Sequence, residues 1–374
     1  MQLSWPEFFR KIDWLLIGAL FALSAIGLLM IYGIGTSYEI TSLLQFRKQL
    51  IAVAIGVTSM AALMLWDYRR MRAYGLIAYA IGLLLLVGVL IFGIEVRGTQ
   101  GWFRLGTVSI QPVEIAKVLF ALFLASYFYK QVHRRLDWIT FFGSLLAMSI
   151  YVGLIMLQPD LGSAMVVLMI WFVGVAFAGM RKRTWALLIS AGVLIIYLSW
   201  SFLLAPYQQQ RLTSFLNPEA DPLGAGYNVL QAQTAIGSGG WFGKGIGEGS
   251  QSRLRFLPEA STDFMFAVMG EELGFAGLAL ILILFAVVLL RILAVGYASR
   301  DIFVQTFTVM ITGMFAMHIL VNAGMNMGIM PVTGIPLPFA SAAASSLVAG
   351  YLAIGIVLNM RITSKSADKT TALH

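Results

Sequence analysis

The stretch that decides the fold class is WLLIGALFALSAIGLLMIY, residues 14–32, which contains no charged residue. A helix rises about 1.5 Å per residue, so a run of this length can cross the roughly 30 Å hydrocarbon core of a bilayer. The rest of the chain is similar, because 59% of its 374 residues are hydrophobic and only 11% are charged. A soluble globular domain has about 25% charged residues, so the composition predicts an integral membrane protein.

Ten apolar runs are long enough to span a membrane. They cover residues 14–32, 49–66, 74–94, 112–129, 138–157, 161–180, 184–204, 264–294, 302–327 and 338–360. We therefore expect an all-α, polytopic protein with about ten transmembrane helices, forming a single transmembrane domain over residues 1–374. The first run has no cleavage-site pattern at its end, so we expect a membrane helix there and no removable signal peptide.

Basic residues predict how the chain crosses the membrane. The connections RRMR (69–72), KQVHRR (130–135) and RKR (181–183) alternate with connections that contain fewer Lys and Arg residues. Because basic loops stay in the cytoplasm, both termini are expected there. The longest connection, 205–262, then lies outside, between the seventh and eighth helices. Long loops in compact proteins typically form lids or binding surfaces.

Several kinds of site are excluded or disfavoured. The chain has no cysteine, which excludes thiol catalysis, and its histidines, His133, His318 and His374, are too scattered to suggest a metal cluster. The glycine-rich run IGSGGWFGKGIGEGS (236–250) lacks the preceding strand and the Lys-Ser/Thr pair of a nucleotide-binding loop. It is either a flexible loop or a segment whose backbone N–H groups and Lys244 approach an anionic headgroup. We expect no nucleic-acid partner.

Carboxylates are concentrated in FLPEASTDFMFAVMGEELG, residues 256–274. Ser261 or Thr262 could cap a helix that begins near Asp263, which leaves Asp263 open as a first-turn acid or a functional one. Glu271 and Glu272 follow about 12–14 Å further along such a helix. An unpaired carboxylate is costly at membrane depth, so we expect these two glutamates to belong to a structural polar network.

Two further motifs lie at the predicted outer surface. In QPVEIAK (111–117), Glu114 and Lys117 are three residues apart and share one helix face. They form either an internal ion pair or part of a phosphate site, and the spacing fits both. In QPDLG (158–162), Asp160 lies at a tight turn, where an acid typically caps the next helix.

Cations also gather on this less basic side of the membrane. They are Arg47, Lys48, Arg97 and Arg104. Side chains that reach toward the interface are the ordinary explanation for such residues. Their number nevertheless favours an anionic ligand, such as a lipid phosphate.

Taken together, these motifs resemble the SEDS family (shape, elongation, division and sporulation), and the similarity runs from the first helix to the last. The strings that carry it are GTQGWFRLG, QPVEIAK, QPDLG, YQQQRLTSFLNPEADPLGAGYNVLQAQTAIGSGGWFGKG, FLPEASTDFMFAVMGEELG and GIPLPF. The string AIGSGGWFGKG after DPLGAGY is more similar to the elongation branch of the family than to its division branch.

The resemblance implies a peptidoglycan glycosyltransferase of the bacterial inner membrane that polymerises lipid II on the outer face. It also implies a class B penicillin-binding protein as transpeptidase partner, with the growing undecaprenyl pyrophosphate-linked glycan and membrane lipids as further partners. In this family the acid of the TDF motif is essential, which makes Asp263 the expected general base. The residues expected to bind substrate are Arg47, Lys48, Arg104, Glu114, Lys117, Asp160, Arg211, Lys244 and Glu259. No cofactor is certain, and a divalent cation, Mg²⁺ or Mn²⁺, stays open.

The chain departs from the family pattern in two places. After LPF the family usually has Ser-Tyr-Gly-Gly-Ser, whereas this chain has SAAASS (341–346), with Ala342, Ala343 and Ala344 in place of Tyr-Gly-Gly. Alanine favours helix over glycine by about 1 kcal/mol per position, so the start of the last helix is expected to be stiffer. Gly101 replaces a bulkier, often basic residue.

Two other functions fit a polytopic protein with these charges. A flippase that moves lipid II across the membrane would also need intramembrane ionisable groups and a pyrophosphate site. The candidate charges cluster at the outer side and no inverted repeat is evident, which disfavours a transporter. A scaffold that only organises the transpeptidase would leave Asp263 replaceable.

Overall fold

The computed structural model describes residues 5–36, 41–96, 98–106, 108–130, 137–179, 190, 192, 226–254 and 256–371. Its helices are α1 (Trp5–Lys11), α2 (Trp14–Thr36), α3 (Thr41–Met64), α4 (Tyr68–Ala73), α5 (Gly75–Phe92), α6 (Pro112–Tyr129), α7 (Trp138–Met156), α8 (Leu161–Phe177), α11 (Tyr227–Ser238), α12 (Ser250–Arg253), α13 (Met265–Ala298), α14 (Ile302–Asn326) and α15 (Ala344–Thr371). Its strands are β1 (Ile94–Val96), β2 (Thr99–Leu105) and β3 (Val108–Ile110).

Within the described ranges, eight helices are long and apolar enough to cross a membrane: α2, α3, α5, α6, α7, α13, α14 and α15. Helix α8 is equally apolar but has 17 residues. These helices coincide with all the predicted runs except 184–204, which lies almost entirely outside the described residues. The prediction of a helical, multi-pass membrane protein is confirmed.

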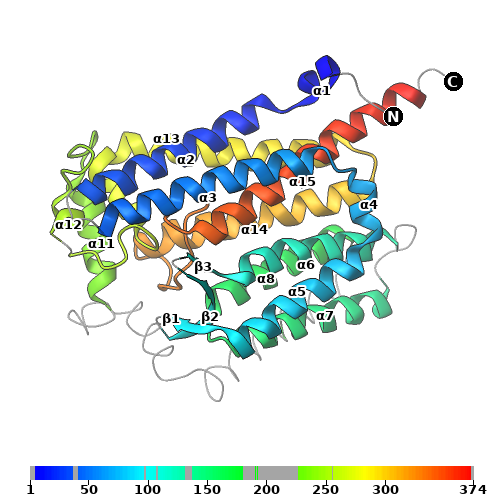
Figure 1. Cartoon of the computed structure of the whole chain (residues 1–374), viewed down its shortest axis with the longest axis horizontal. Helices are drawn as coiled ribbons and strands as arrows, with labels where there is room; N and C mark the ends of the chain where they lie inside the picture. Colours follow the sequence, from blue (N-terminus) through cyan, green and yellow to red (C-terminus); the bar gives the residue numbers. More distant parts are fainter. Residues whose placement is uncertain are drawn as a thin grey trace.

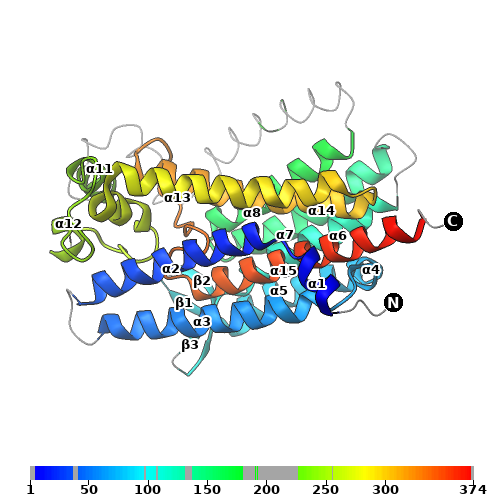
Figure 2. The ribbon, with the colours of Figure 1, turned by 90° about the horizontal axis from the view of Figure 1, so that it is seen from above.

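The long helices run side by side along the longest axis of the molecule (Figure 1). Helices α11 and α12 lie at one end, and the three strands lie toward that same end (Figures 1 and 2). Helix α1 and the last turns of α15 lie together at the opposite end. The described parts of the N-terminal and C-terminal segments are therefore on the same side of the helical bundle.

Residues 94–110, predicted only as part of an outer loop, form a three-stranded antiparallel sheet in the order β1-β2-β3. Strand β2 supplies Trp102 and Phe103, and aromatic residues of this kind favour strands. Gly98 lies between β1 and β2, and Gly106 lies between β2 and β3. Their φ angles are 78° and 64°, which glycine adopts without strain. The sheet gives the wall of the site described below a hydrogen-bonded backbone.

Helices α3 and α15 pack closely against each other because each has a glycine, Gly56 on α3 and Gly355 on α15, that faces a larger residue of the other helix. A Cβ atom on Gly355 would lie 2.9 Å from the Cα atom of Met60, and one on Gly56 would lie 2.7 Å from the Tyr351 ring. Small residues permit such close approach of membrane helices, where van der Waals packing drives association. This close packing positions α15, whose first residues belong to the SAAASS segment.

Ion pairs fasten the helices together near the end that carries α1. The Asp13 carboxylate, 2% exposed, accepts hydrogen bonds from Arg291 Nε and Nη2 at 2.9 and 2.7 Å, and it also contacts Arg361. Arg72 pairs with Asp301 at 3.0 Å. The contacts of Asp13 connect the beginning of α2 with Arg291 on α13 and Arg361 on α15. Three distant parts of the sequence therefore share one charged cluster.

Helix α13 is divided by a kink at Gly274, whose φ and ψ angles are 68° and −168°. The part after the kink, 275–298, is about 36 Å long at 1.5 Å per residue and is sufficient to span the bilayer alone. The part before it, 265–273, is a short helix that carries Glu271 and Glu272. Backbone groups that lose their helical partners at the kink form hydrogen bonds with the glycine-rich loop. For example, Phe275 N donates to Gly240 O at 2.9 Å.

Replacing Gly274 with Ala should lower the free energy of unfolding by about 2 kcal/mol or more. This φ/ψ region is essentially restricted to glycine, and an added Cβ would overlap the backbone nitrogens of Phe242 and Gly243. Thermal unfolding in detergent measures the effect. Gly153→Ala on α7 is the matched control, since its Cβ would meet nothing within 4 Å. Equal melting temperatures for the two variants would contradict the prediction.

Candidate functional site

A cavity of about 280 Å³ lies where the sheet, the starts of α6 and α8, the turn before α13, helix α14 and the segment 331–343 meet. Its charged and polar lining residues are Thr99, Gln111, Glu114, Lys117, Asp160, Ser163, Thr262, Asp263, His318 and Thr333. The cavity thus brings together four of the predicted site residues, which are far apart in the sequence: Glu114, Lys117, Asp160 and Asp263.

Glu114 and Lys117 form a buried ion pair on the first turns of α6. Pro112 starts this helix, and the Lys117 Nζ atom lies 2.8 Å from Glu114 Oε1. The Lys117 side chain is 2% exposed and the Glu114 side chain is 6% exposed, yet both line the cavity. Of the two interpretations left open by their spacing, the ion pair is observed, and its position also leaves the ammonium within reach of a ligand.

Asp160 is the N-cap residue of α8, as its position in a tight turn predicts. Its carboxylate accepts hydrogen bonds from Ser163 N at 2.9 Å, Ser163 Oγ at 2.7 Å and Gln111 Nε2 at 3.2 Å. Burial raises the pKa of the Asp160 carboxyl, and the bonds from Ser163 oppose that rise. The residue therefore caps a helix and presents a carboxyl group to the cavity.

Asp263 lies in a turn just before α13. The helix begins at Met265, and its N-cap residue, Phe264, makes no side-chain cap bond. The expectation that Ser261 or Thr262 caps this helix is therefore wrong, because the turn continues two residues further than the sequence pattern indicates. Thr262 Oγ1 instead donates to Glu259, at 3.1 Å from Oε2.

Other segments hold the backbone of this turn in place. Ser341 Oγ donates to Thr262 O, and Ala342 N donates to Ser261 O, both at 2.7 Å. Ala342 and Ala343 also line the cavity. Two of the positions where this chain departs from the family pattern, Ala342 and Ala343, consequently lie in the wall of the site.

One face of α14 organises the site and was missed from the sequence. His318, Asn322 and Asn326 follow each other at intervals of four residues, so they lie on the same face of the helix. Asn322 Nδ2 and Asn326 Nδ2 both donate to Asp263 O at 3.0 Å. The signal was available, because polar residues at i, i+4 and i+8 in an apolar helix mark a face that contacts polar groups.

His318 lies at the other end of this face. Its Nε2 atom is 3.2 Å from Lys117 Nζ, and its Nδ1 atom is 3.4 Å from Pro336 O. Asn322 Nδ2 also donates to Ile335 O at 2.8 Å. The same helix face therefore touches the cation, the turn with Asp263 and the segment 335–336.

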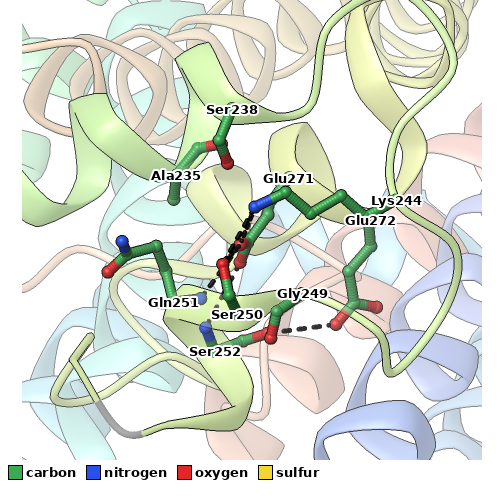
Figure 3. A network of polar contacts seen from close by, with 9 residues as sticks. All are labelled: Ala235, Ser238, Lys244, Gly249, Ser250, Gln251, Ser252, Glu271 and Glu272. Carbon is green, nitrogen blue, oxygen red and sulfur yellow. Dashed lines mark hydrogen bonds and ion pairs between the residues drawn. The ribbon is translucent and has the colours of Figure 1, made fainter.

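Glu271 and Glu272 lie outside the cavity, in a polar network with the glycine-rich loop and α12 (Figure 3). Glu271 is fully buried and accepts hydrogen bonds from Lys244 Nζ and Gln251 N, each at 2.9 Å. Glu272 accepts from Gly247 N at 3.0 Å and from Ser252 Oγ at 3.2 Å. The two carboxylates fasten the loop to the short helix 265–273.

The remaining predicted site residues that the structure describes do not line the cavity. Lys244 pairs with Glu271, Glu259 belongs to the turn before Asp263, and Arg104 is exposed on β2. Arg47 and Lys48 lie on α3, next to Gln49, which donates to Ser341 O at 2.9 Å. Arg211 and Arg97 lie outside the described residues.

The described residues contain no group of three or more His, Asp or Glu side chains that could hold a metal ion. The carboxylates of the cavity are instead engaged with protein partners, as Asp160 and Glu114 show. A protein ligand set for Mg²⁺ or Mn²⁺ is therefore not evident in this part of the chain.

Comparison with known proteins identifies the family. The model for FtsW, RodA and SpoVE, described as cell cycle protein, matches residues 13–366. Stage V sporulation protein E of Bacillus subtilis is 37% identical over 93% of this chain and 96% of its own length. Peptidoglycan glycosyltransferase RodA of Treponema pallidum is 32% identical over 93% of this chain and 97% of its own length.

A solved structure agrees with these matches. A chain in a peptidoglycan synthase complex, described as coordinating polymerization and crosslinking, superimposes with a TM-score of 0.80 and 31% sequence identity. The similarity covers 94% of this chain and 97% of that one. Because the family model and these relatives each extend over nearly the whole sequence, the chain belongs to the SEDS family of FtsW, RodA and SpoVE proteins.

Proposed function

We propose that this chain is a peptidoglycan glycosyltransferase that polymerises lipid II into β-1,4-linked glycan strands. The observation that carries the proposal is that a carboxylate, Asp263, and a buried cation, Lys117, line one cavity in a SEDS protein. A relative that is 32% identical over almost the entire chain is named as a peptidoglycan glycosyltransferase.

The reaction needs what the two residues supply. The 4-hydroxyl of an N-acetylglucosamine unit attacks C1 of an α-linked N-acetylmuramyl pyrophosphate, the new C1–O bond forms, and the bond to the pyrophosphate breaks. Direct displacement inverts C1 and gives the β linkage. Asp263 accepts the hydroxyl proton as general base, and Lys117 stabilises the negative charge on the departing undecaprenyl pyrophosphate.

The membrane setting suits this substrate. The polyprenyl chains stay between apolar helices while the sugars and pyrophosphate enter the cavity. We place both termini in the cytoplasm and the cavity on the outer side of the bacterial inner membrane. The basic connections support this orientation, as does the position of α1 and the end of α15 opposite α11 and α12.

We further propose that this polymerisation serves cell elongation and rod shape and that the transpeptidase partner is a class B penicillin-binding protein. The string AIGSGGWFGKG after DPLGAGY supports the elongation branch, together with the relative named RodA. The similarity to a chain of a complex that coordinates polymerization and crosslinking supports a transpeptidase partner.

The test is gel-resolved polymerisation of purified lipid II by the protein with its cognate transpeptidase. We expect glycan polymer from the chain as it stands. We expect a higher yield when Ala342, Ala343 and Ala344 are changed to Tyr, Gly and Gly, because these positions form the cavity wall and the start of α15. No polymer from either protein would favour a flippase or a scaffold instead.

A further inference from the structure

We infer that His318 is a positioning residue that holds the Lys117 ammonium group in a fixed orientation at the cavity. The inference rests on the proposed function, in which Lys117 stabilises the departing pyrophosphate. It concerns a histidine that was considered from the sequence only as a possible metal ligand.

The contact is enclosed by protein. Lys117 is 1% exposed and His318 is 3% exposed, and the 3.2 Å between Nζ and Nε2 joins α6 to α14 across the cavity lining. A lysine side chain has a flexible four-carbon stem, so a single ion pair with Glu114 leaves its ammonium free to rotate. A second partner from another helix restricts that rotation.

The geometry also specifies the hydrogen-bonding roles of the imidazole. An ammonium group has three donors and no acceptor, so Nε2 must be unprotonated to accept from Lys117. The proton of the neutral ring is then on Nδ1, which faces the carbonyl oxygen of Pro336 at 3.4 Å. The ring is neutral, Nδ1-protonated and fastened at both nitrogens.

A neutral acceptor suits the proposed chemistry better than a second carboxylate. Glu114 already balances the charge of Lys117, and another negative group would repel an anionic leaving group. Of the three ammonium donors, Glu114 takes one and His318 takes a second. The third remains for an oxygen of a pyrophosphate in the cavity.

His318 also relates the cation to the base. It shares one face of α14 with Asn322 and Asn326, whose side chains hold the Asp263 carbonyl. One rigid helix therefore sets the positions of Lys117 and of the Asp263 turn. A misplacement of about 1 Å of a catalytic group can cost about 10²-fold in rate.

Three substitutions separate the two hydrogen bonds of the ring. His318→Gln retains an acceptor near the Nε2 position, whereas His318→Asn retains only a donor near Nδ1, and His318→Leu retains neither. We expect polymerisation close to wild type for Gln and a loss of about 10²-fold in kcat for Asn and Leu. KM for lipid II should change little, because the orientation of Lys117 matters most when the leaving group develops charge.

Equal activity of the Gln and Asn variants would overturn the inference. Equal activity of the Gln and Leu variants would also overturn it, because Leu fills a volume similar to that of the ring but has no acceptor. Thermal unfolding of each variant is measured alongside, and the activities are compared between variants with matched melting temperatures. Absence of polymer from the wild-type protein would overturn the proposed function instead, and the ring is then examined directly.

The ring itself is observed by ¹⁵N spectroscopy of histidine-labelled protein in membranes. The chain has three histidines, and His318→Gln identifies the signal of interest. We expect a neutral, Nδ1-protonated ring whose Nε2 signal shifts in a Lys117→Met variant. A ring protonated on Nε2, or an Nε2 signal unchanged by that substitution, would overturn the assignment.

Discussion

Glycan polymerisation should fall by a factor of about 10²–10⁴ when Asp263 is replaced with Asn, the size expected for the loss of a general base. The amide has nearly the same shape as the carboxyl group but cannot take up the proton of the attacking hydroxyl. The measurement is the polymerisation assay with purified lipid II, with the protein at equal concentration and with the same transpeptidase.

Backbone contacts of the turn that carries Asp263 are kept in this variant. The hydrogen bonds that place the turn involve the backbone oxygen of Asp263, which accepts from Asn322 and Asn326, and these bonds do not depend on the side chain. The melting temperature should therefore change little. Glu248→Gln provides the matched acid-to-amide control, because the Glu248 side chain is 68% exposed and lies outside the cavity lining. Polymer yields that are the same for wild type and Asp263→Asn would rule out the base assignment.

Replacing Lys117 with Met should damage both stability and activity. The substitution removes the partner of a buried carboxylate, and breaking a buried pair in this way costs about 3–5 kcal/mol. It also removes the cation proposed to stabilise the pyrophosphate, for which we expect a loss of about 10²–10³ in kcat. Thermal unfolding and the polymerisation assay report the two effects separately.

A double variant distinguishes the structural role of Lys117 from its proposed catalytic role. In Glu114→Gln/Lys117→Met neither charge remains, so we expect most of the lost stability to return. Activity should stay as low as in Lys117→Met, since the amide cannot replace the ammonium. Recovery of polymerisation together with stability would show that the pair serves only the fold.

The helical membrane fold was predictable because apolar runs are read directly from the sequence. Residues 14–32 and the corresponding runs coincide with helices where the structure describes them. The small sheet at 94–110 was missed because its strands are short, and no hydrophobic periodicity reveals three-residue strands such as β1 and β3. The Gly274 kink was missed because a glycine inside an apolar run reads as ordinary helix.

The site was predictable where motifs carry chemistry at a fixed spacing. Glu114 and Lys117 were paired from their i, i+3 positions, and the structure adds their shared cavity with Asp263. The polar face of α14 that includes His318 was visible in the sequence, but its contact with Lys117 on α6 was not, because sequence distance says nothing about contacts between helices. Lys244 was grouped with the substrate-binding cations for a related reason, since its partner Glu271 is 27 positions away.

The kink in α13 also relates the glycine-rich loop to the proposed base. Asp263 lies two residues before the short helix 265–273, and Glu271 lies near the end of that helix, about 9 Å beyond Met265 at 1.5 Å per residue. Glu271 is clamped to Lys244 and α12, while the Asp263 end is clamped to α14. Both ends of this segment are therefore tied to neighbouring elements, and the Gly274 kink separates it from the membrane-spanning part of the helix, 275–298.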